Sequence, residues 1–306
     1  HLTEENDFIV LEGDEYLSSP IDKRPKFHLY KPNIALLSGI AWDHINVFPT
    51  FENYVSQFST FINTITPGGT LVYNQEDEVL HNLVQESTHP IKKCPYKMPK
   101  HQVENGQTFL DTPEGLVPIQ VFGTHNLLNL EGAKWLCQLM GIDALDFYEA
   151  ISTFKGAQKR LELLAEGNTA IAYKDFAHAP SKVRAVTASF CNQFESKHVL
   201  ACLELHTYSS LNPTFIKEYA KALHEADEAV VFYSPKAVAL KGLKPLEETQ
   251  IQEAFARPDL KVFTNATAFE AFLHKKELQN TAVLLMSSGN YGGLNWSALK
   301  DKIKAS

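Results

Sequence analysis

Two segments in the N-terminal half carry side chains that suit a magnesium ion. Glu12 opens an acidic segment, Glu-Gly-Asp-Glu, directly after the apolar run 8–11. His44 follows Asp43 shortly after the apolar run 34–40. Because ligands of open α/β sheets bind beyond the carboxyl ends of the strands, both side chains are expected at a ligand site. A carboxylate and an imidazole beside substrate phosphates suit Mg²⁺, although helix-capping acids and an ordinary loop histidine explain the same residues.

A second candidate site lies at the start of a helical segment in the middle of the chain. Asn126 and Asn129 are one turn apart in a helix expected from about 126 to 140, with Gly141 as its C-terminal cap. Their amides would share one face and can read the edge of a purine. N-capping by His125 or Asn126 is the simpler explanation, and these residues alone favour it.

Three features of the C-terminal half suit an anion or a nucleotide. Arg160 offers a planar cation that can reach phosphate, although a surface arginine is the alternative. Asp175 ends an expected strand, where an acid can accept ribose hydroxyls or cap the next helix. The segment 287–293, Ser-Ser-Gly-Asn-Tyr-Gly-Gly, joins a strand to a helix as anion-binding turns do, but it is not GxGxxG. No GxxxxGK[ST] phosphate loop occurs in the 306 residues.

The elements that must position these residues predict an α/β protein with two domains. Residues 1–157 show a mostly parallel sheet with a small β-rich subregion at 90–122, where 112–115 is a hairpin turn. Strands and helices alternate over 158–306, which predicts a Rossmann-like, doubly wound domain. The expected strands are 8–11, 34–40, 71–73, 170–175, 198–205, 229–233, 261–264 and 282–287. The expected helices, besides 126–140, are 51–65, 181–194, 213–226 and 267–278.

Length and composition exclude several classes of protein. At roughly 150 residues per domain, 306 residues make two domains. A hydrophobic content of 44% and a charged content of 21% exclude disorder. The net charge of −8 argues against a nucleic-acid partner, and no apolar run approaches the roughly 18 residues of a membrane span. The four cysteines lack CxxC spacing, which favours free thiols in a reducing compartment, the cytoplasm.

Five segments, in this order, resemble motifs of the Mur ligase family, the ATP-dependent amide ligases of peptidoglycan synthesis. They are 11–16 (LEGDEY), 43–44 (DH), 125–129 (HNLLN), 159–162 (KRLE) and 175–180 (DFAHAP). The resemblance implies that residues 1–157 are the C-terminal part of the family's central ATP-binding domain and 158–306 its C-terminal domain. It further implies a fragment without the N-terminal domain, which holds the UDP-sugar in the family, and without the phosphate-loop half of the ATPase domain.

The resemblance also implies roles for the matching residues, with Mg²⁺ as cofactor and ATP as co-substrate. Glu12 and His44 match the magnesium ligands, and His44 and Arg160 are expected to be catalytic. The residues expected at ATP are Asn126 and Asn129 for adenine, Arg160 for the γ-phosphate and Asp175 near the ribose. The residues expected at the incoming amine are Ser288, Gly289, Asn290, Tyr291 and Gly292.

Within the family, segments 13–27 and 286–293 resemble one branch. It joins the murein tripeptide L-alanyl-γ-D-glutamyl-meso-diaminopimelate to UDP-N-acetylmuramate in peptidoglycan recycling. The implied chemistry is phosphorylation of the sugar carboxylate to an acyl phosphate, with release of ADP, followed by displacement of phosphate by the amine. The alternatives are the ligase that joins L-alanine to the same sugar, and a module that binds nucleotide or peptide without turnover.

The resemblance has departures and consequences. Phe58 stands where some family members carry a carbamylated lysine, and the segment 204–210 lacks an arginine that related ligases often place there. Because the 306 residues hold no phosphate loop, the chain alone is expected to have little or no ligase activity. An incomplete sheet would expose an unpaired edge, so association between copies is expected.

Overall fold

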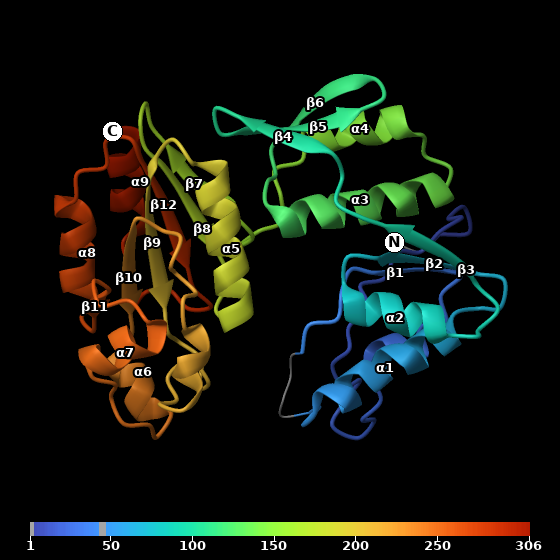
Figure 1. Ribbon diagram of the computed structural model, residues 1–306, viewed down its shortest axis with the longest axis horizontal. Coiled ribbons are helices and arrows are strands. Elements are labelled where there is room, and N and C mark those ends of the chain that lie inside the picture. Colours follow the sequence, from blue (N-terminus) through green and yellow to red (C-terminus); the bar gives the residue numbers. More distant parts are fainter. Residues whose placement is uncertain (1–2, 43–46) are drawn as a thin grey trace. The chain divides into compact units, whose positions relative to one another are not determined.

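The computed structural model describes residues 3–42 and 47–306, which form two compact units (Figure 1). The first contains the chain up to Lys100 together with His125–Ile151, and the second contains His101–Thr124 together with Ser152–Ser306. The expected domain boundary at 157/158 lies close to the crossing between Ile151 and Ser152. Residues 101–124, expected with the first domain, group with the C-terminal unit instead.

The first unit is built on a parallel sheet of three strands in the order β1-β2-β3. These strands are β1 (Ile34–Leu37), β2 (Thr70–Asn74) and β3 (Lys92–Tyr96). The helices α1 (Phe51–Thr64) and α2 (Glu78–Glu86) pack with the sheet in one core. Helix α1 buries Tyr54, Phe58, Phe61 and Ile62, the spacing of an amphipathic helix. The expected helix at 51–65 and strand at 71–73 are confirmed, whereas β1 ends three residues earlier than expected.

Helix α3 (Thr124–Leu139) confirms the expected helix at 126–140 and approaches this sheet closely. Its residues Leu128, Trp135, Leu136 and Leu139 pack against Val72, Cys94 and Tyr96. A Cβ atom on Gly132 would lie 3.0 Å from Leu36 and 3.2 Å from Tyr96, so a larger residue there would push the helix off the sheet. Gly141, with φ +91°, ends this region as expected, and a helix missing from the sequence-based expectation, α4 (Ala144–Ser152), follows.

The strand expected at 8–11 is wrong. Residues 8–11 are irregular, and their side chains are exposed: Phe8 52%, Ile9 63%, Val10 77% and Leu11 58%. An apolar run becomes a strand only where a neighbouring strand pairs with its backbone, and in the described part of the chain β1 pairs with β2 alone. The following residues form a loop that is closed by bonds from Phe27 N–H to Asp14 O and from Lys26 N–H to Tyr16 O.

We expect copies of this chain to associate through the exposed run 8–11 and the open edge of β1. An unpaired strand edge and exposed apolar side chains each favour association between chains. Sedimentation velocity at several concentrations should show a concentration-dependent dimer or larger species. The double variant Ile9→Lys, Val10→Lys should sediment as a monomer, whereas the matched variant Leu240→Lys, at an exposed residue of the other unit (79%), should not change the association. A wild-type chain that stays monomeric at every concentration would contradict this expectation.

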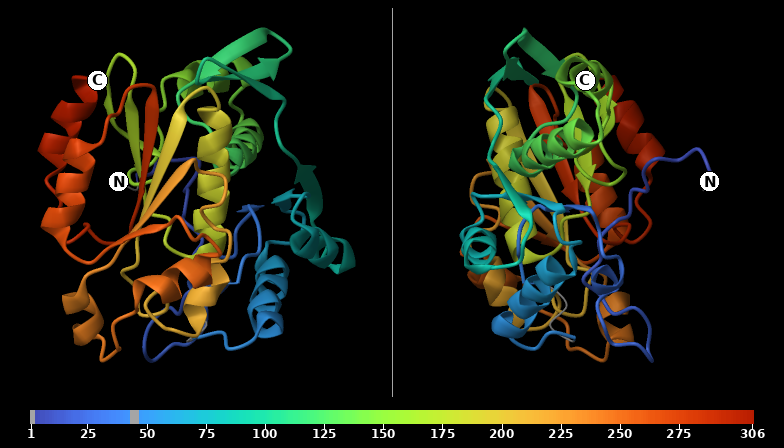
Figure 2. Two further views of the ribbon diagram at one scale, coloured as in Figure 1. Left: turned by 60° about the vertical axis from the view of Figure 1, so that its left-hand side comes forward. Right: turned by 90° about the vertical axis from the view of Figure 1, so that its right-hand side faces the viewer.

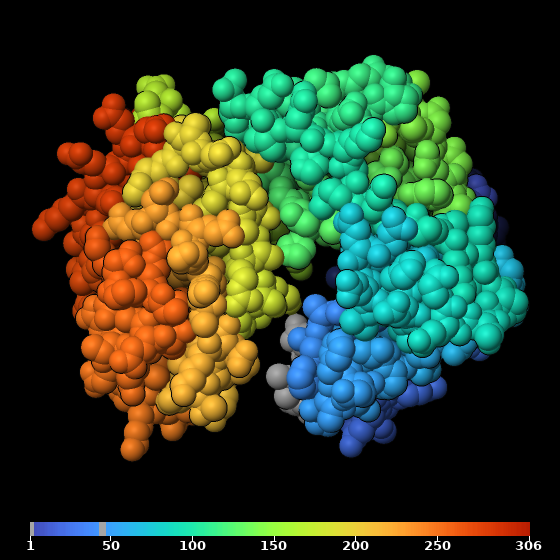
Figure 3. All heavy atoms as spheres, in the orientation of Figure 1, coloured from blue at the N-terminus to red at the C-terminus, as the bar shows by residue number. Residues whose placement is uncertain are grey.

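A small antiparallel sheet belongs to the C-terminal unit. It consists of β4 (His101–Glu104), β5 (Gln107–Thr112) and β6 (Gly115–Ile119), and the hairpin turn expected at 112–115 joins the last two. Thr108 Oγ1 donates to Gln193 Oε1 (3.0 Å), and Gln193 Nε2 donates to Gly106 O (2.6 Å). Gln193 ends α5 (Pro180–Gln193), so these bonds attach the small sheet to this helix. In Figure 3 the atoms of the small sheet are coloured teal to green and those of α5 yellow.

The C-terminal unit has the expected doubly wound fold, with a six-stranded sheet in the order β11-β10-β9-β12-β8-β7. Its strands are β7 (Glu162–Glu166), β8 (Ile171–Asp175), β9 (His198–Glu204), β10 (Glu228–Phe232), β11 (Lys261–Phe263) and β12 (Thr281–Met286). Only β7 is antiparallel to its neighbour. Helices α5 and α7 (Glu248–Phe255) cover one face, and α8 (Ala266–Lys275) and α9 (Trp296–Lys304) cover the other (Figure 2). Continuous apolar runs suit such strands because both faces are buried.

The helix expected at 213–226 is wrong in type and length. The structure has a short 3₁₀ helix, η2 (Phe215–Tyr219), followed by turns. The N–H of Lys221 donates to Phe255 O of α7 (3.0 Å), and Lys221 has a φ of +61°. This tertiary hydrogen bond replaces a helical one, so the helix stops. Strand β7 and the helices α6 (Pro235–Leu240) and α7 were not expected from the sequence.

Within residues 3–42 and 47–306, no helix combines the length and apolar character needed to cross a bilayer.

Candidate functional site

Two of the expected nucleotide residues, Asp175 and Arg160, are linked through the backbone of one loop. Asp175 is the last residue of β8. Its Oδ2 accepts a hydrogen bond from Leu161 N–H (2.8 Å), and its Oδ1 accepts one from Ala177 N–H (2.6 Å). The N–H of Phe176 donates to Lys159 O (2.8 Å). The loop that carries Arg160 is therefore held against the carboxyl end of β8, and the Arg160 side chain lies exposed.

The same loop is strained on both sides of Arg160. Lys159 and Leu161 have φ angles of +58° and +42°, in the left-handed region that costs energy for residues with a Cβ atom. Glu162 Oε2 accepts a bond from Lys159 N–H (2.7 Å), and its Oε1 lies 2.9 Å from Lys174 Nζ. Burial raises the pKa of Glu162, but the Lys159 amide and Lys174 outweigh it and leave the pKa below its ordinary value. This stabilisation is present above the ordinary pKa and is lost as pH falls through the lowered one.

The loop expected to bind the amine follows β12 at the same edge of the sheet. Ser287 N–H donates to Asp175 O (2.9 Å), so this loop begins beside the end of β8. Glu204, the last residue of β9, is 2% exposed and lies under the loop. Its Oε2 accepts hydrogen bonds from Tyr291 N–H (2.7 Å) and from Ser287 Oγ. A buried carboxylate therefore holds both ends of the loop.

Within this loop, individual residues have different surroundings. Tyr291 is 1% exposed and has a φ of +54°; its hydroxyl bonds to Cys202 O and Met286 O (both 2.8 Å), and burial raises its pKa well above the ordinary value. A Cβ atom on Gly289 would lie 2.8 Å from Glu204 Oε2 and 2.9 Å from the His206 ring, so a larger residue there would displace one of these side chains. Asn290 and Gly292 are exposed.

The hydroxyl of Ser288 is buried, and no partner for it is found in the described structure. Nearby, His206 Nδ1 lies 3.7 Å from Glu204 Oε1, and 42% of the His206 side chain is exposed. The segment 204–210, which departs from the family pattern, thus contributes the acid beneath the loop and an imidazole at its surface.

In the first unit, the structure places Asn126 and Asn129 on α3, one turn apart as expected. Asn126 is half-buried and Asn129 is exposed. Leu128, Trp135 and Leu136 of α3 pack against β2 and β3, and Leu127 and Leu130 of the same helix are also buried. The two amides therefore stand at the start of a helix whose position the sheet determines.

The expected magnesium ligands are only partly described. Glu12 lies exposed on irregular chain, and His44 lies outside the described residues. No group of three or more His, Cys, Asp or Glu side chains placed to hold a metal occurs in 3–42 and 47–306. One exposed carboxylate does not form a Mg²⁺ site by itself, so the described residues do not fit the ion without further ligands.

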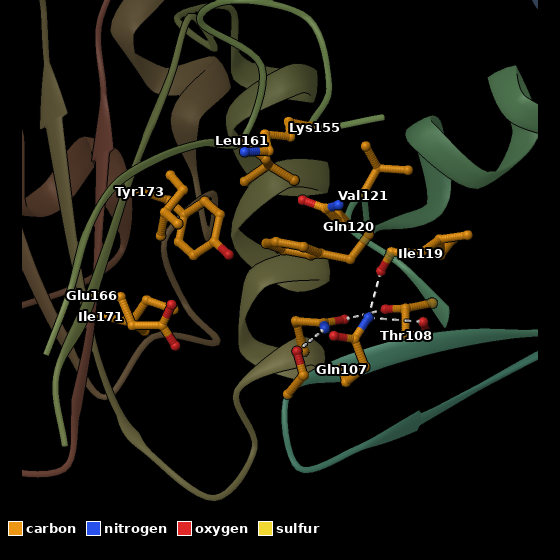
Figure 4. Close-up of a pocket in the computed structure, with 14 residues that line it drawn as sticks. Gln107, Thr108, Ile119, Gln120, Val121, Lys155, Leu161, Glu166, Ile171 and Tyr173 are labelled. Carbon is orange, nitrogen blue, oxygen red and sulfur yellow. Dashed lines mark hydrogen bonds between the residues drawn. The ribbon is translucent and has the colours of Figure 1, made fainter. Parts of the chain in front are cut away.

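A cavity of about 270 Å³ lies elsewhere in the C-terminal unit, between the small sheet and strands β7 and β8. Gln107, Thr108 and Ile119 border it on one side, and Leu161 and Tyr173 border it on the other (Figure 4). Gln107 Nε2 donates to Ile119 O (2.5 Å). Burial raises the pKa of Tyr173 to about 12, so its phenol is neutral at ordinary pH. Of the expected site residues, none lines this cavity.

Sequence reasoning missed Glu204 and Glu162 as residues that support the site. Glu204 ends a strand whose preceding residues, 199–203, are all apolar and buried. An acid in that position was the available signal, because a buried carboxylate needs donors. Glu162 is the last residue of the family-like segment 159–162, but its role as a support depends on partners that only the left-handed turn at 159–161 brings to it.

Comparison with known proteins relates this chain to the Mur ligases. Residues 1–137 match the family model described as the Mur ligase middle domain. Residues 1–137 are therefore similar to the middle domain of Mur ligases. A UDP-N-acetylmuramate–L-alanine ligase from Caldicellulosiruptor bescii is 27% identical over 237 residues, which is 74% of this chain and 50% of that protein. The UDP-N-acetylmuramate–L-alanyl-γ-D-glutamyl-meso-2,6-diaminoheptandioate ligase of Escherichia coli is 26% identical over 309 residues, 96% of this chain and 65% of that protein.

Solved structures of Mur ligases share the fold. A murein peptide ligase from Psychrobacter arcticus superimposes with a TM-score of 0.57 at 19% identity, covering 94% of this chain and 62% of that one. The MurF ligase from Thermotoga maritima in complex with ADP gives a TM-score of 0.64 at 15% identity, covering 90% and 62%. The chain thus spans about half to two thirds of the length of the curated Mur ligases it matches.

Proposed function

We propose that the protein containing these 306 residues is an ATP-dependent, ADP-forming ligase that joins L-alanyl-γ-D-glutamyl-meso-diaminopimelate to UDP-N-acetylmuramate. The observation that carries this proposal is the meeting of the Arg160 loop, Asp175 and the loop after β12 at the carboxyl edge of one doubly wound sheet. That edge is where such sheets bind ligands. The match to the Mur ligase middle domain supports the same chemistry.

In this proposal the sugar carboxylate attacks the γ-phosphorus of ATP, the bond to the β,γ-bridging oxygen breaks, and ADP leaves. The peptide amine then attacks the acyl phosphate, loses a proton, and displaces phosphate. Arg160 neutralises charge on the γ-phosphoryl group, and Asn126 and Asn129 bind adenine. The residues proposed at the amine are Ser288, Gly289, Asn290, Tyr291 and Gly292. Catalysis then consists of positioning and charge neutralisation, without a protein nucleophile.

Mg²⁺ held by Glu12 and His44 remains part of the proposal by family resemblance. A cytoplasmic location is proposed on the same basis; the four cysteines, all in the described structure, are free thiols.

The second candidate is the ligase that adds L-alanine to UDP-N-acetylmuramate. Several of the matched curated proteins carry that name, at 24–27% identity, against 26% for the tripeptide ligase. Segments 13–27 and 286–293 favour the tripeptide.

We expect the full-length protein to release ADP from ATP, Mg²⁺ and UDP-N-acetylmuramate when the tripeptide is supplied, and not when L-alanine is supplied. The measurement is coupled ADP release in separate reactions. ADP release with L-alanine alone would replace the proposal with the second candidate. No ADP release with either substrate would favour a module that binds nucleotide or peptide without turnover. The 306-residue chain alone should release little ADP, because it holds no phosphate loop to cradle the β- and γ-phosphates.

A further inference from the structure

We propose that Asp175 and Glu162 are positioning residues: together they hold the strained loop 159–161 and fix the direction in which Arg160 presents its guanidinium. Family resemblance instead gives Asp175 a place near the ribose. This inference rests on the proposed function only for the role of Arg160 at phosphate.

The two carboxylates bind opposite ends of the loop. Asp175 accepts the N–H of Leu161, the residue after Arg160 (2.8 Å), and Glu162 accepts the N–H of Lys159, the residue before it (2.7 Å). Phe176 N–H adds a bond to Lys159 O (2.8 Å). Arg160 therefore stands between two anchored peptide groups.

The backbone needs this support. Lys159 and Leu161, the left-handed residues on the two sides of Arg160, cost of order 1–3 kcal/mol each and persist only where the surroundings hold them. Neither is a glycine, so the free chain would leave this conformation when the carboxylates are lost.

The fixed conformation of the loop 159–161 would help Arg160 to reach a phosphoryl group. An arginine side chain has many rotamers. Phosphoryl transfer is faster when the backbone that carries the guanidinium group is already in position to bring it to the phosphoryl group. The Arg160 side chain is exposed and the loop beneath it is fixed, which is the arrangement expected of a cation presented to a ligand.

Hydrogen exchange of the 306-residue chain tests whether Asp175 and Glu162 hold the loop 159–161. This measurement does not depend on ligase activity. In Asp175→Asn, the amides of Leu161 and Ala177 should exchange about 10-fold faster or more, the factor that a hydrogen bond to a charged group is worth. Glu162→Gln should accelerate Lys159 and leave Ala177 unchanged. The matched control is Asp227→Asn. Asp227 accepts a hydrogen bond from Val199 N–H (2.7 Å) near the start of β9. Its substitution should leave the exchange rate of the Leu161 amide unchanged. Unchanged exchange of Leu161 in Asp175→Asn would overturn the proposal.

A double-mutant cycle in the full-length protein tests the action through Arg160. Asp175→Asn should lower kcat for ADP release about 10-fold with little change in the KM for ATP, and should cost nothing further in an Arg160→Ala background. Additive losses, or a loss confined to the KM for ATP, would show direct contact with the nucleotide and overturn the proposal. If the wild-type protein releases no ADP, the proposed function fails. The exchange measurement still decides whether Asp175 and Glu162 hold the loop 159–161.

Discussion

The Arg160→Ala variant of the full-length protein should lose about 10³-fold in kcat for ADP release, at the lower end of what an arginine at a transferring phosphoryl group contributes. The guanidinium lies exposed on a loop whose two flanking amides are bound by carboxylates, so the wild-type side chain needs little reorganisation to meet the phosphate. The KM for ATP should change much less than kcat, because the charge that Arg160 neutralises develops mainly in the transition state.

The measurement is steady-state ADP release with saturating UDP-N-acetylmuramate and peptide. Arg160→Lys should recover only a small part of the loss, because a point charge does not reproduce the planar fork. Arg184→Ala is the matched control: Arg184 is another exposed arginine of the same unit, and it donates to Ala220 O (3.0 Å). A kcat of Arg160→Ala within about 3-fold of wild type would remove Arg160 from the chemistry, since one oxyanion-type contact is worth about 10²-fold or more.

The second large effect is expected from Glu204→Ala, which should lower the free energy of unfolding of the C-terminal unit by about 3 kcal/mol. The substitution leaves the N–H of Tyr291 and the hydroxyl of Ser287 without their acceptor in a buried place, and each such group costs about 1–3 kcal/mol. It also leaves a void where the carboxylate packs against Gly289. The loop after β12 should therefore become mobile, and the KM for the acceptor amine should rise.

Urea unfolding of the 306-residue chain, followed by far-UV circular dichroism, measures this change in the free energy of unfolding. Glu204→Gln keeps the shape and one acceptor oxygen, so it should lose less than Glu204→Ala. Glu253→Ala, at an exposed position of α7, is the control and should change stability by no more than about 0.5 kcal/mol. A change below about 1 kcal/mol in Glu204→Ala would show that the buried carboxylate is not what holds the loop.

The sequence by itself determined the features that depend on neighbours along the chain. The apolar spacing of 51–65 predicted α1, and the turn residues at 112–115 predicted the hairpin of β5 and β6. The alternation after 158 predicted the doubly wound sheet, because each parallel strand needs a crossover helix or loop before the next. The order of five short motifs was enough to point to the family.

Only the tertiary structure decided which residues support the site and which apolar runs pair. Residues 8–11 look like a strand but remain exposed, because a strand depends on a partner's backbone. Glu204 and Tyr291 are 87 residues apart, and sequence spacing carries no sign that one binds the other's amide. Asp175 was predicted at a strand end, as found, but its bond to Leu161 requires a left-handed turn between residues that strongly resist it. Long-range hydrogen bonds of this kind offset the energy of a strained local backbone. Local sequence preferences therefore cannot reveal them.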